Sequence, residues 1–279
     1  MRHLHQYIIG LGLLSSTVAS AFDFYADLLY WQPSESVDWA LTNSDIDTVI
    51  PTNQAILYKT ISFAYAPGFR LGAGFQKEAF DVRLFYTRLK TNAEDNISGN
   101  VLSTFMPSKF NTKFYSLAQV NFGIDFNMVD LDLSKKIQVD EDLQFNPFLG
   151  LRGGFINQEI NTHYQGPKKV PASSFNPNNV LEQVTNDFSG VGPAVGLGGL
   201  WNFYKKSGVQ YGLIGSVSGA YLWGKWSIND ILIQDNGEVI GGLDVGRRDF
   251  GAFAVQALVG LQAEYQDFSV KLGYEVSDW

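Results

Sequence analysis

Charged side chains stand at alternate positions within otherwise apolar segments, and they are the main candidates for chemistry. Phe80, Val82 and Leu84, for example, alternate with Asp81 and Arg83. Carboxylates and guanidinium groups that share one phase can form ion pairs or set the electric field in a water-filled passage. The charges in this polar phase are Arg70, Asp81, Arg83, Asp125, Asp130, Asp132, Arg152, Glu264, Lys271 and Glu275.

The spacing of two residues indicates extended strands, because successive side chains of a strand point to opposite faces. Behind an export signal, strands of about ten residues with one apolar face predict a transmembrane β-barrel whose apolar face meets lipid. Arg or Lys on that face costs roughly 2–4 kcal/mol at the bilayer midplane, so the charged phase is expected to face inward. The alternation recurs at Phe69 to Phe75, Phe114 to Phe126, Val209 to Leu213 and Phe268 to Tyr274.

An export signal precedes these segments. The basic start MRHLHQ is followed by an apolar run from Tyr7 to Ala19 and by the small residues Ala19-Ser20-Ala21. This arrangement predicts a cleaved signal peptide at residues 1–21 and one barrel domain at residues 22–279. The run is too short for a membrane-spanning helix, and no later run approaches 18 apolar residues.

Composition narrows the class of protein. Taking Arg2 from the 20 basic residues leaves 19 against 28 acidic ones, and this balance argues against nucleic acid as a partner. The chain has no cysteine, which excludes disulfides, thiol chemistry and cysteine-ligated metals. Charged residues at 17% are few for a soluble surface, whereas aromatic residues at 14% suit the belts at the membrane interfaces.

Few residues suit catalysis or metal binding. His163 is the one histidine after the signal, and spacing pairs no Ser or Asp with it, so we interpret it as a solvated loop residue. The loop acids lack the DxDxDG pattern of calcium loops. Gly190 to Gly199 keeps a period of two with Pro193 inside it, which disfavours a phosphate-binding loop. We therefore expect no enzymatic activity, no metal and no cofactor.

Long and short connections alternate along the chain, as in outer-membrane barrels with long outer loops and short periplasmic turns. Long polar loops are expected at residues 33–55, 91–111, 159–186 and 225–248. Nine strands are expected: residues 22–32, one that ends near 76, one that begins near 79, 112–133 with a break near 127, 145–157, 188–203, 208–223, 249–265 and 268–276.

Nine is an unusual count, because closed single-chain bacterial barrels normally have an even number of strands. Trp279 also falls out of phase with the apolar residues from Phe268 to Val276. These observations favour a barrel of about ten strands in its complete form, with a final strand missing here. The alternative is a misplaced boundary between Lys135 and Leu143, where we expect a polar turn or a short hairpin.

Five stretches resemble the legionella-type major outer membrane protein family, a porin group similar to the chlamydial major outer membrane protein. They occur in family order over nearly the whole mature chain. The resemblance implies a porin-like surface barrel whose chain runs beyond an LGYE-like strand, here Leu272 to Glu275. The stretches are ADLLYWQPSE from Ala26, APGFRLGAGF from Ala66, NPFLGLRGGF from Asn146, FSGVGPAVGL from Phe188 and YLWG from Tyr221.

The inward charges have two possible roles. They can form ion-pair networks that fill a narrow barrel, or line a water-filled pore. A barrel of about eight strands is filled by its own side chains, and nine or ten strands lie near that limit. The pore-lining hypothesis names Arg70, Asp81, Arg83, Asp125, Arg152, Glu264 and Lys271. The aromatic residues expected at the membrane interfaces are Tyr30, Trp31, Trp201, Tyr221 and Trp223.

Together these patterns predict a porin-like protein of the bacterial outer membrane that allows passive diffusion of ions or small solutes. The alternative is a non-conducting structural or adhesive barrel that acts through its long outer loops. The expected partners are outer-membrane lipid and the diffusing ions or solutes. Under the alternative, host or envelope components contact the loops.

Overall fold

The computed structural model describes residues 6–17, 22–43, 56–77, 79–105, 114–167, 179–266 and 268–279. Within these ranges every regular element is a β-strand, and neighbouring strands run antiparallel. The expected all-β antiparallel fold is confirmed. None of the described residues belongs to a helix long and apolar enough to cross a membrane.

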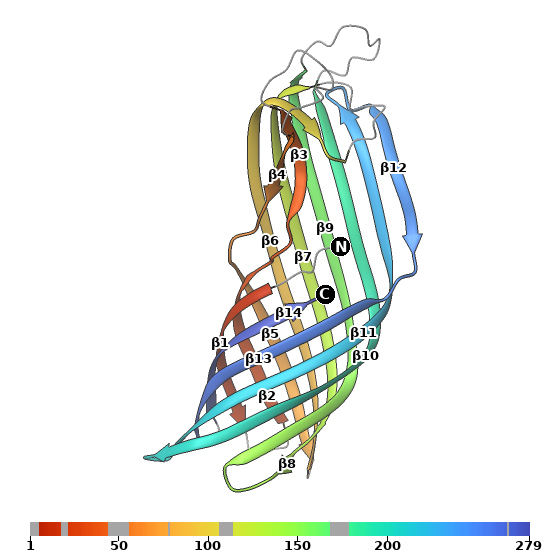
Figure 1. Ribbon diagram of the computed structural model, residues 1–279. Helices are drawn as coiled ribbons and strands as arrows, with labels where there is room; N and C mark the ends of the chain where they lie inside the picture. The colour runs from red at the N-terminus through yellow and green to blue at the C-terminus, as the bar shows by residue number, and fades with distance from the viewer. Residues whose placement is uncertain are drawn as a thin grey trace.

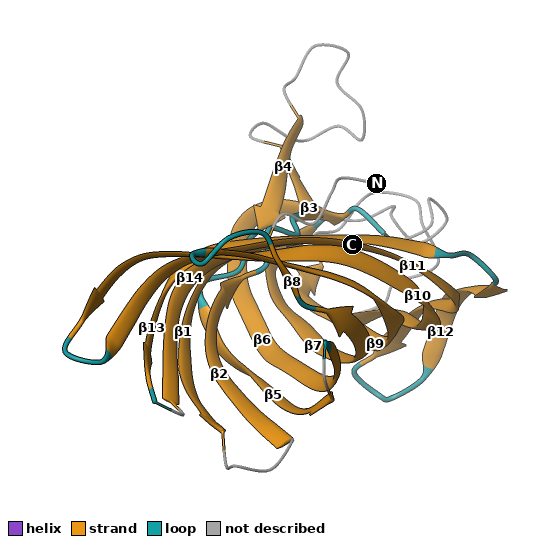
Figure 2. Ribbon diagram, turned by 90° about the horizontal axis from the view of Figure 1, so that it is seen from below, coloured by secondary structure: helices purple, strands orange, loops and turns teal. Residues whose placement is uncertain are grey.

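Nine strands pair successively in chain order and match the nine expected from the sequence. Seen from below, they curl around a common interior (Figure 2). In pairing order they are β2 (Phe22–Gln32), β5 (Ala66–Lys77), β6 (Phe80–Ser103), β7 (Tyr115–Lys135), β9 (Leu143–Pro167), β10 (Val180–Lys206), β11 (Val209–Gln234), β13 (Ala252–Tyr265) and β14 (Phe268–Asp278).

The two ends of this nine-stranded sheet, β2 and β14, do not pair with each other, so the strands from Phe22 onward do not close the sheet by themselves. Strand β1 (Gln6–Thr17) lies between them and pairs antiparallel with both. β1 belongs to the predicted signal peptide. The boundary between signal peptide and barrel domain after residue 21 stays a prediction.

Short reversals connect several strands at the lower end of Figure 1. Between β10 and β11, Ser207 and Gly208 have φ values of 53° and 81°, and Lys206 pairs with Val209. Two successive residues with positive φ match the twist of the flanking strands, which suits a two-residue hairpin. Between β7 and β9 the chain forms the short strand β8 (Ile137–Gln138), which pairs with β9. The short-hairpin expectation for this region is therefore confirmed.

Five strands are far longer than a membrane requires. β6, β7, β9, β10 and β11 contain 21 to 27 residues, whereas about 9–11 tilted residues cross a bilayer. They rise together into the upper half of the molecule (Figure 1). Three further strands widen this upper sheet: β3 (Val37–Asn43) pairs with β6, β4 (Ile56–Ile61) with β3, and β12 (Val239–Arg248) with β11.

The length of these strands shows that much of the expected long loops is wrong. Much of residues 91–111, 159–186 and 225–248 is strand, and β3 lies in the first expected loop. His163 belongs to β9, opposite Gln119 of β7 and Leu181 of β10, and not to a loop. A strand surrounded by water has no need of an apolar outer face, so these segments lack the alternation that marks the lower strands.

Candidate functional site

The apolar side chains change sides part-way along the long strands. On β7, Val129, Leu131 and Leu133 are exposed on the outer face, whereas Phe122 and Phe126 are buried in the interior. The strand stays continuous through this change. Exposed apolar residues below and buried ones above indicate that lipid surrounds the lower part of the strand and water the upper part.

This change of sides corrects two expectations. The alternation in Phe114 to Phe126 was taken as lipid-facing, but Phe122, Ile124 and Phe126 face inward. Asp125 lies between two of these residues and therefore points outward. Its carboxylate is 3.6 Å from Arg88 Nη2 on the outer face of β6. Asp125 is thus not a lumen residue. At its level on β7 the apolar side chains face the interior, so the polar side chains between them face outward.

Arg70 crosses the interior to Glu275. Its Nη1 and Nη2 atoms donate hydrogen bonds of 3.0 and 2.9 Å to the two carboxylate oxygens, and its Nε donates to Thr87 Oγ1 at 3.0 Å. Asp27 is a longer partner at 3.8 Å. Glu275 is almost fully buried. Two parallel bonds between a guanidinium and a carboxylate fix both groups in one geometry.

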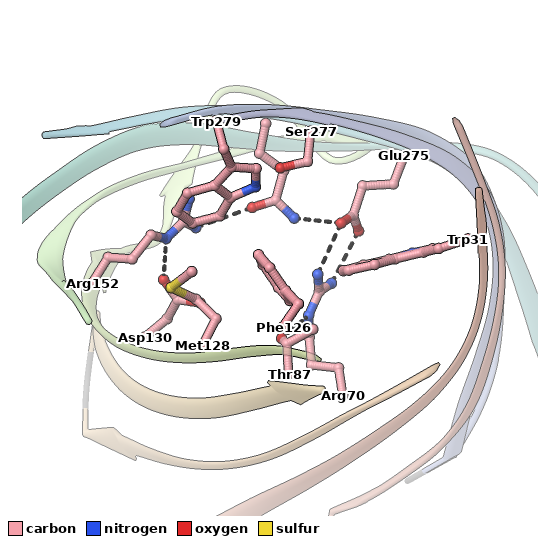
Figure 3. Close-up of a pocket in the computed structure, with 11 residues that line it drawn as sticks. Trp31, Arg70, Thr87, Phe126, Met128, Asp130, Arg152, Glu275, Ser277 and Trp279 are labelled. Carbon is pink, nitrogen blue, oxygen red and sulfur yellow. Dashed lines mark hydrogen bonds and ion pairs between the residues drawn. The ribbon is translucent and has the colours of Figure 1, made fainter. Parts of the chain in front are cut away.

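Arg152 makes the second link across the interior. It forms an ion pair with Asp130 on the neighbouring strand β7, and its Nη2 donates to Gln256 Oε1 of β13 at 3.0 Å. Gln256 Nε2 in turn donates to Glu275 Oε1 at 2.6 Å. A chain of polar contacts therefore runs from Arg70 through Glu275 and Gln256 to Arg152 (Figure 3).

Aromatic rings cover this polar layer. Phe126 lies between Trp31 and Trp279, with ring centroids 5.8 and 5.3 Å away. The Arg152 guanidinium lies 5.6 Å from the Trp279 ring centroid, within the range of a cation–π contact. The cavity that remains among these side chains is about 10 Å³, which is room for about one water molecule. Figure 3 shows these side chains projecting from opposite parts of the wall into one layer of the interior.

Trp31 therefore differs from the expected interface aromatics. It is 2% exposed and packs inside the barrel, because it lies in the inward phase of β2 next to Leu29. The other four residues of that set are exposed on the outer face. They are Tyr30, Trp201, Tyr221 and Trp223. Their role at the membrane interface stays a prediction.

The polar contacts from Arg70 through Glu275 and Gln256 to Arg152 are called the bridge below. The remaining candidate lumen residues lie below it in the barrel. Arg83 pairs with Asp81 at 3.2 Å and donates to Ser134 Oγ at 2.8 Å. Lys271 is partly buried on β14. Glu264 is exposed near the β13–β14 turn, where it accepts a hydrogen bond from Gln262. The structure brings Arg70 and Arg152 into one polar network and leaves the others outside it.

Sequence reasoning missed several interior residues. Gln256 is inward on β13 but uncharged, so a search for charges passed over it. Trp39, Tyr164 and Glu182 are buried in the upper half, inside segments expected to be loops. The described residues contain no cluster of three or more His, Asp or Glu side chains that could hold a metal ion.

The comparison with protein families identifies the chain. The model of the Legionella pneumophila major outer membrane protein precursor matches residues 15–279. The chain belongs to this family. The resemblance noted in the sequence is confirmed, and family and fold together make the protein an outer-membrane β-barrel. No curated protein matches the chain.

Two solved structures are similar at low identity. The Escherichia coli outer membrane protease OmpT has 11% identity and a TM-score of 0.41, and the match covers 100% of this chain and 96% of that one. A bacterial polysaccharide outer membrane secretin has 6% identity and a TM-score of 0.15, with coverage of 98% and 97%.

The first of these structures contradicts the expectation that the chain is no enzyme, because a protein similar to it is a protease. We withdraw that expectation. A likeness at 11% identity transfers no activity, so no reaction is assigned in its place.

Proposed function

We propose that the protein is a porin-like barrel through which ions or small solutes diffuse passively. The outer-membrane family and the barrel support a route across the membrane. The lower interior carries Asp81, Arg83 and Lys271, which are groups that a hydrated passage accommodates.

One observation carries the proposal: the charged side chains of Asp81, Arg83 and Lys271 face the interior of the lower barrel, where the outer face of the wall is apolar. In the upper half, the described parts of the connection between β2 and β5, residues 33–43 and 56–65, carry β3 and β4, which extend the sheet beside β6, and the buried side chains of Trp39, Ile61 and Phe63.

The alternative is a non-conducting structural or adhesive barrel. It is favoured by the small cavity at the level of Arg70 and Arg152, where two links cross the interior. In that case the bridge serves to stabilise a filled barrel, and the upper strands present the surface that contacts envelope or host components.

Single-channel recording separates the two functions. The purified, folded protein is inserted into a planar bilayer at high salt, and current steps are expected. A variant with Glu275→Gln loses the charge of the bridge and is expected to spend more time open. Asp125→Asn, on the outer face, is the matched control and is expected to leave the current unchanged. A folded protein that shows no steps, with or without Glu275→Gln, would refute conduction and support the structural alternative.

A further inference from the structure

Three polar side chains lie within the apolar core of the upper half, on the inner face of the wall strands β9, β10 and β11. Thr162 and Glu182 are 0% exposed, and Asp230 is 7% exposed. Buried apolar side chains flank them, since Leu232 is paired with Glu182 and Val180 lies two residues away on the same face of β10. A carboxylate removed from water in this way is costly unless a partner compensates its charge.

The register of the strands brings the three side chains together. Thr162 of β9 is directly paired with Glu182 of β10, and both face inward. Asp230 lies two residues before Leu232 on the inner face of β11, which makes it the diagonal neighbour of Glu182. Direct neighbours have Cβ atoms about 4.5–5.5 Å apart, and diagonal neighbours lie about 7–8 Å apart, within reach of a long side chain. The two carboxylates and the hydroxyl therefore share one site.

Each of the three side chains has a buried oxygen atom without a hydrogen-bond partner. These atoms are Glu182 Oε1, Asp230 Oδ1 and Thr162 Oγ1. Buried polar atoms of folded proteins nearly always have a partner, so three exceptions side by side indicate a ligand. All three atoms carry lone pairs, and the two carboxylate oxygens can only accept. The ligand that suits them is a cation.

The other carboxylate oxygen of Glu182 is already held in place. Ser103 of β6 donates a hydrogen bond of 2.7 Å to Oε2, and the Tyr164 hydroxyl of β9 lies 3.2 Å from the same atom. These contacts orient the carboxylate and leave Oε1 available to a ligand. Hydroxyl groups that orient a ligating carboxylate from behind are a regular feature of metal sites.

The described residues around Glu182 supply no positive charge. The groups that interact with its carboxyl are Asp230 of β11, Ser103 of β6, Tyr164 of β9 and Tyr115 of β7, and none of these is Lys or Arg. Both acids lie above the apolar band. Burial raises the pKa of Glu182 to about 8 and that of Asp230 to about 6. Either protons or a metal ion must therefore compensate the two carboxylates.

We propose that Glu182, Asp230 and Thr162 form a calcium-binding site in the upper half of the barrel. Glu182 Oε1, Asp230 Oδ1 and Thr162 Oγ1 are the protein ligands, and water completes the coordination shell. Ca²⁺ takes carboxylate and neutral oxygen ligands at about 2.3–2.6 Å in a flexible geometry, whereas Mg²⁺ demands a nearly ideal octahedron. Ligands whose positions are set by three paired strands suit the more tolerant ion.

The composition of the site sets its strength. In the described part of the chain no third acid or histidine joins the two carboxylates. With this charge, the dissociation constant is expected at about 10⁻⁴–10⁻³ M, the range of extracellular calcium modules. The upper strands lie beyond the apolar band, on the side that the outer-membrane plan places outside the cell. Asp230 is the member of the site that still contacts solvent, and the bound ion would connect β9, β10 and β11.

Calorimetric titration with calcium chloride tests the site in the folded, full-length protein. The protein is first treated with EDTA and dialysed, and its folded state is checked by gel mobility without heating. At pH 9 we expect one Ca²⁺ per chain. At pH 6 binding is expected to be about 10-fold weaker or more, because protons on Glu182 compete with the metal. A folded protein that binds no calcium at pH 9 would overturn the proposal, and Glu182 would then hold a proton only.

Charge-neutral variants locate the ion. Glu182→Gln and Asp230→Asn keep the shape of each side chain without its charge, and each is expected to weaken binding at pH 9 about 10-fold or more. Glu94→Gln and Asp125→Asn remove acids from the outer face and are the matched controls, with binding unchanged. Calcium held by residual lipid phosphate contributes equally in all four variants. Binding that is unchanged in both Glu182→Gln and Asp230→Asn would overturn the site.

A pair of substitutions at Thr162 tests the neutral ligand. Thr162→Val replaces the hydroxyl by a methyl group of similar size and is expected to weaken calcium binding about 5-fold. Thr162→Ser keeps the hydroxyl and is expected to retain the affinity of the parent. Equal affinities in the two variants would contradict the role of Thr162 Oγ1 as a ligand. The titration measures binding without current, so its outcome is independent of whether the barrel conducts.

Discussion

Arg70 and Glu275 form a two-bond ion pair across the barrel interior, although their strands, β5 and β14, are separated in the sheet by β2 and β1. The pair therefore connects distant parts of the wall and not two neighbouring strands. Glu275 is fixed further by Gln256, which joins it to Arg152. A single substitution at this position is expected to affect both links.

Glu275→Ala is expected to destabilise the folded barrel by roughly 3–5 kcal/mol, because it leaves the largely enclosed Arg70 guanidinium with only the longer contact to Asp27. Urea unfolding in lipid vesicles measures the change. Glu264→Ala, which removes an exposed acid from the neighbouring strand β13, is expected to cost less than about 1 kcal/mol. Equal losses in the two variants would show that the bridge contributes no special stability.

Trp31→Ala is expected to cost roughly 3–5 kcal/mol, because it removes a buried ring that packs on Phe126 and leaves a cavity. Trp223→Ala removes an exposed ring of similar size on the outer face, and we expect a smaller loss of stability. Heat-induced unfolding in detergent, followed by gel mobility, compares the two. A larger loss at Trp223 would contradict the interior placement of Trp31.

The period-two pattern predicted the fold because it has a direct physical cause in the membrane. In the lower strands lipid requires an apolar outer face, so the alternation at Asp81 and Arg83 correctly predicted their inward orientation. All nine wall strands were predicted in this way. The same pattern gave the wrong side for Asp125. The apolar side chains of β7 face outward in the bilayer and inward above it, and the spacing of the residues does not show where this change occurs.

The buried cluster around Glu182 in the upper half could not be predicted because its contacts join residues far apart in the chain. Glu182 and Ser103 are separated by 79 positions, and Tyr164 and Trp39 by 125. Each lies in a polar stretch that, by itself, is typical of a surface loop. Only the pairing of β3 with β6, and the length of β9 and β10, brings these residues into one buried cluster.

If current is observed, Arg152→Gln is expected to shift the selectivity toward cations, because it leaves the interior acids Asp130 and Glu275 with one fewer positive charge beside them. The reversal potential under a tenfold salt gradient measures the shift. Arg88→Gln, which changes a charge on the outer face, is the control. An unchanged reversal potential in Arg152→Gln would show that ions take another route.

Stability is expected to fall as pH rises, and Glu182 supplies part of that fall. Burial raises the pKa of its carboxyl to about 8 from the usual 4.5, so the folded state binds a proton that the unfolded state releases. The stabilisation is complete below pH 4.5 and is lost as pH approaches 8. In Glu182→Gln this contribution is absent, so the urea midpoint is expected to decrease less between pH 5 and pH 9 than in the parent. Burial also raises the pKa of Glu35 to about 7 and that of Asp230 to about 6, and both acids still titrate in the variant. The difference between the two proteins, and not either curve alone, is therefore the measurement. Parallel curves over the whole range would mean that Glu182 is already ionised in the folded state.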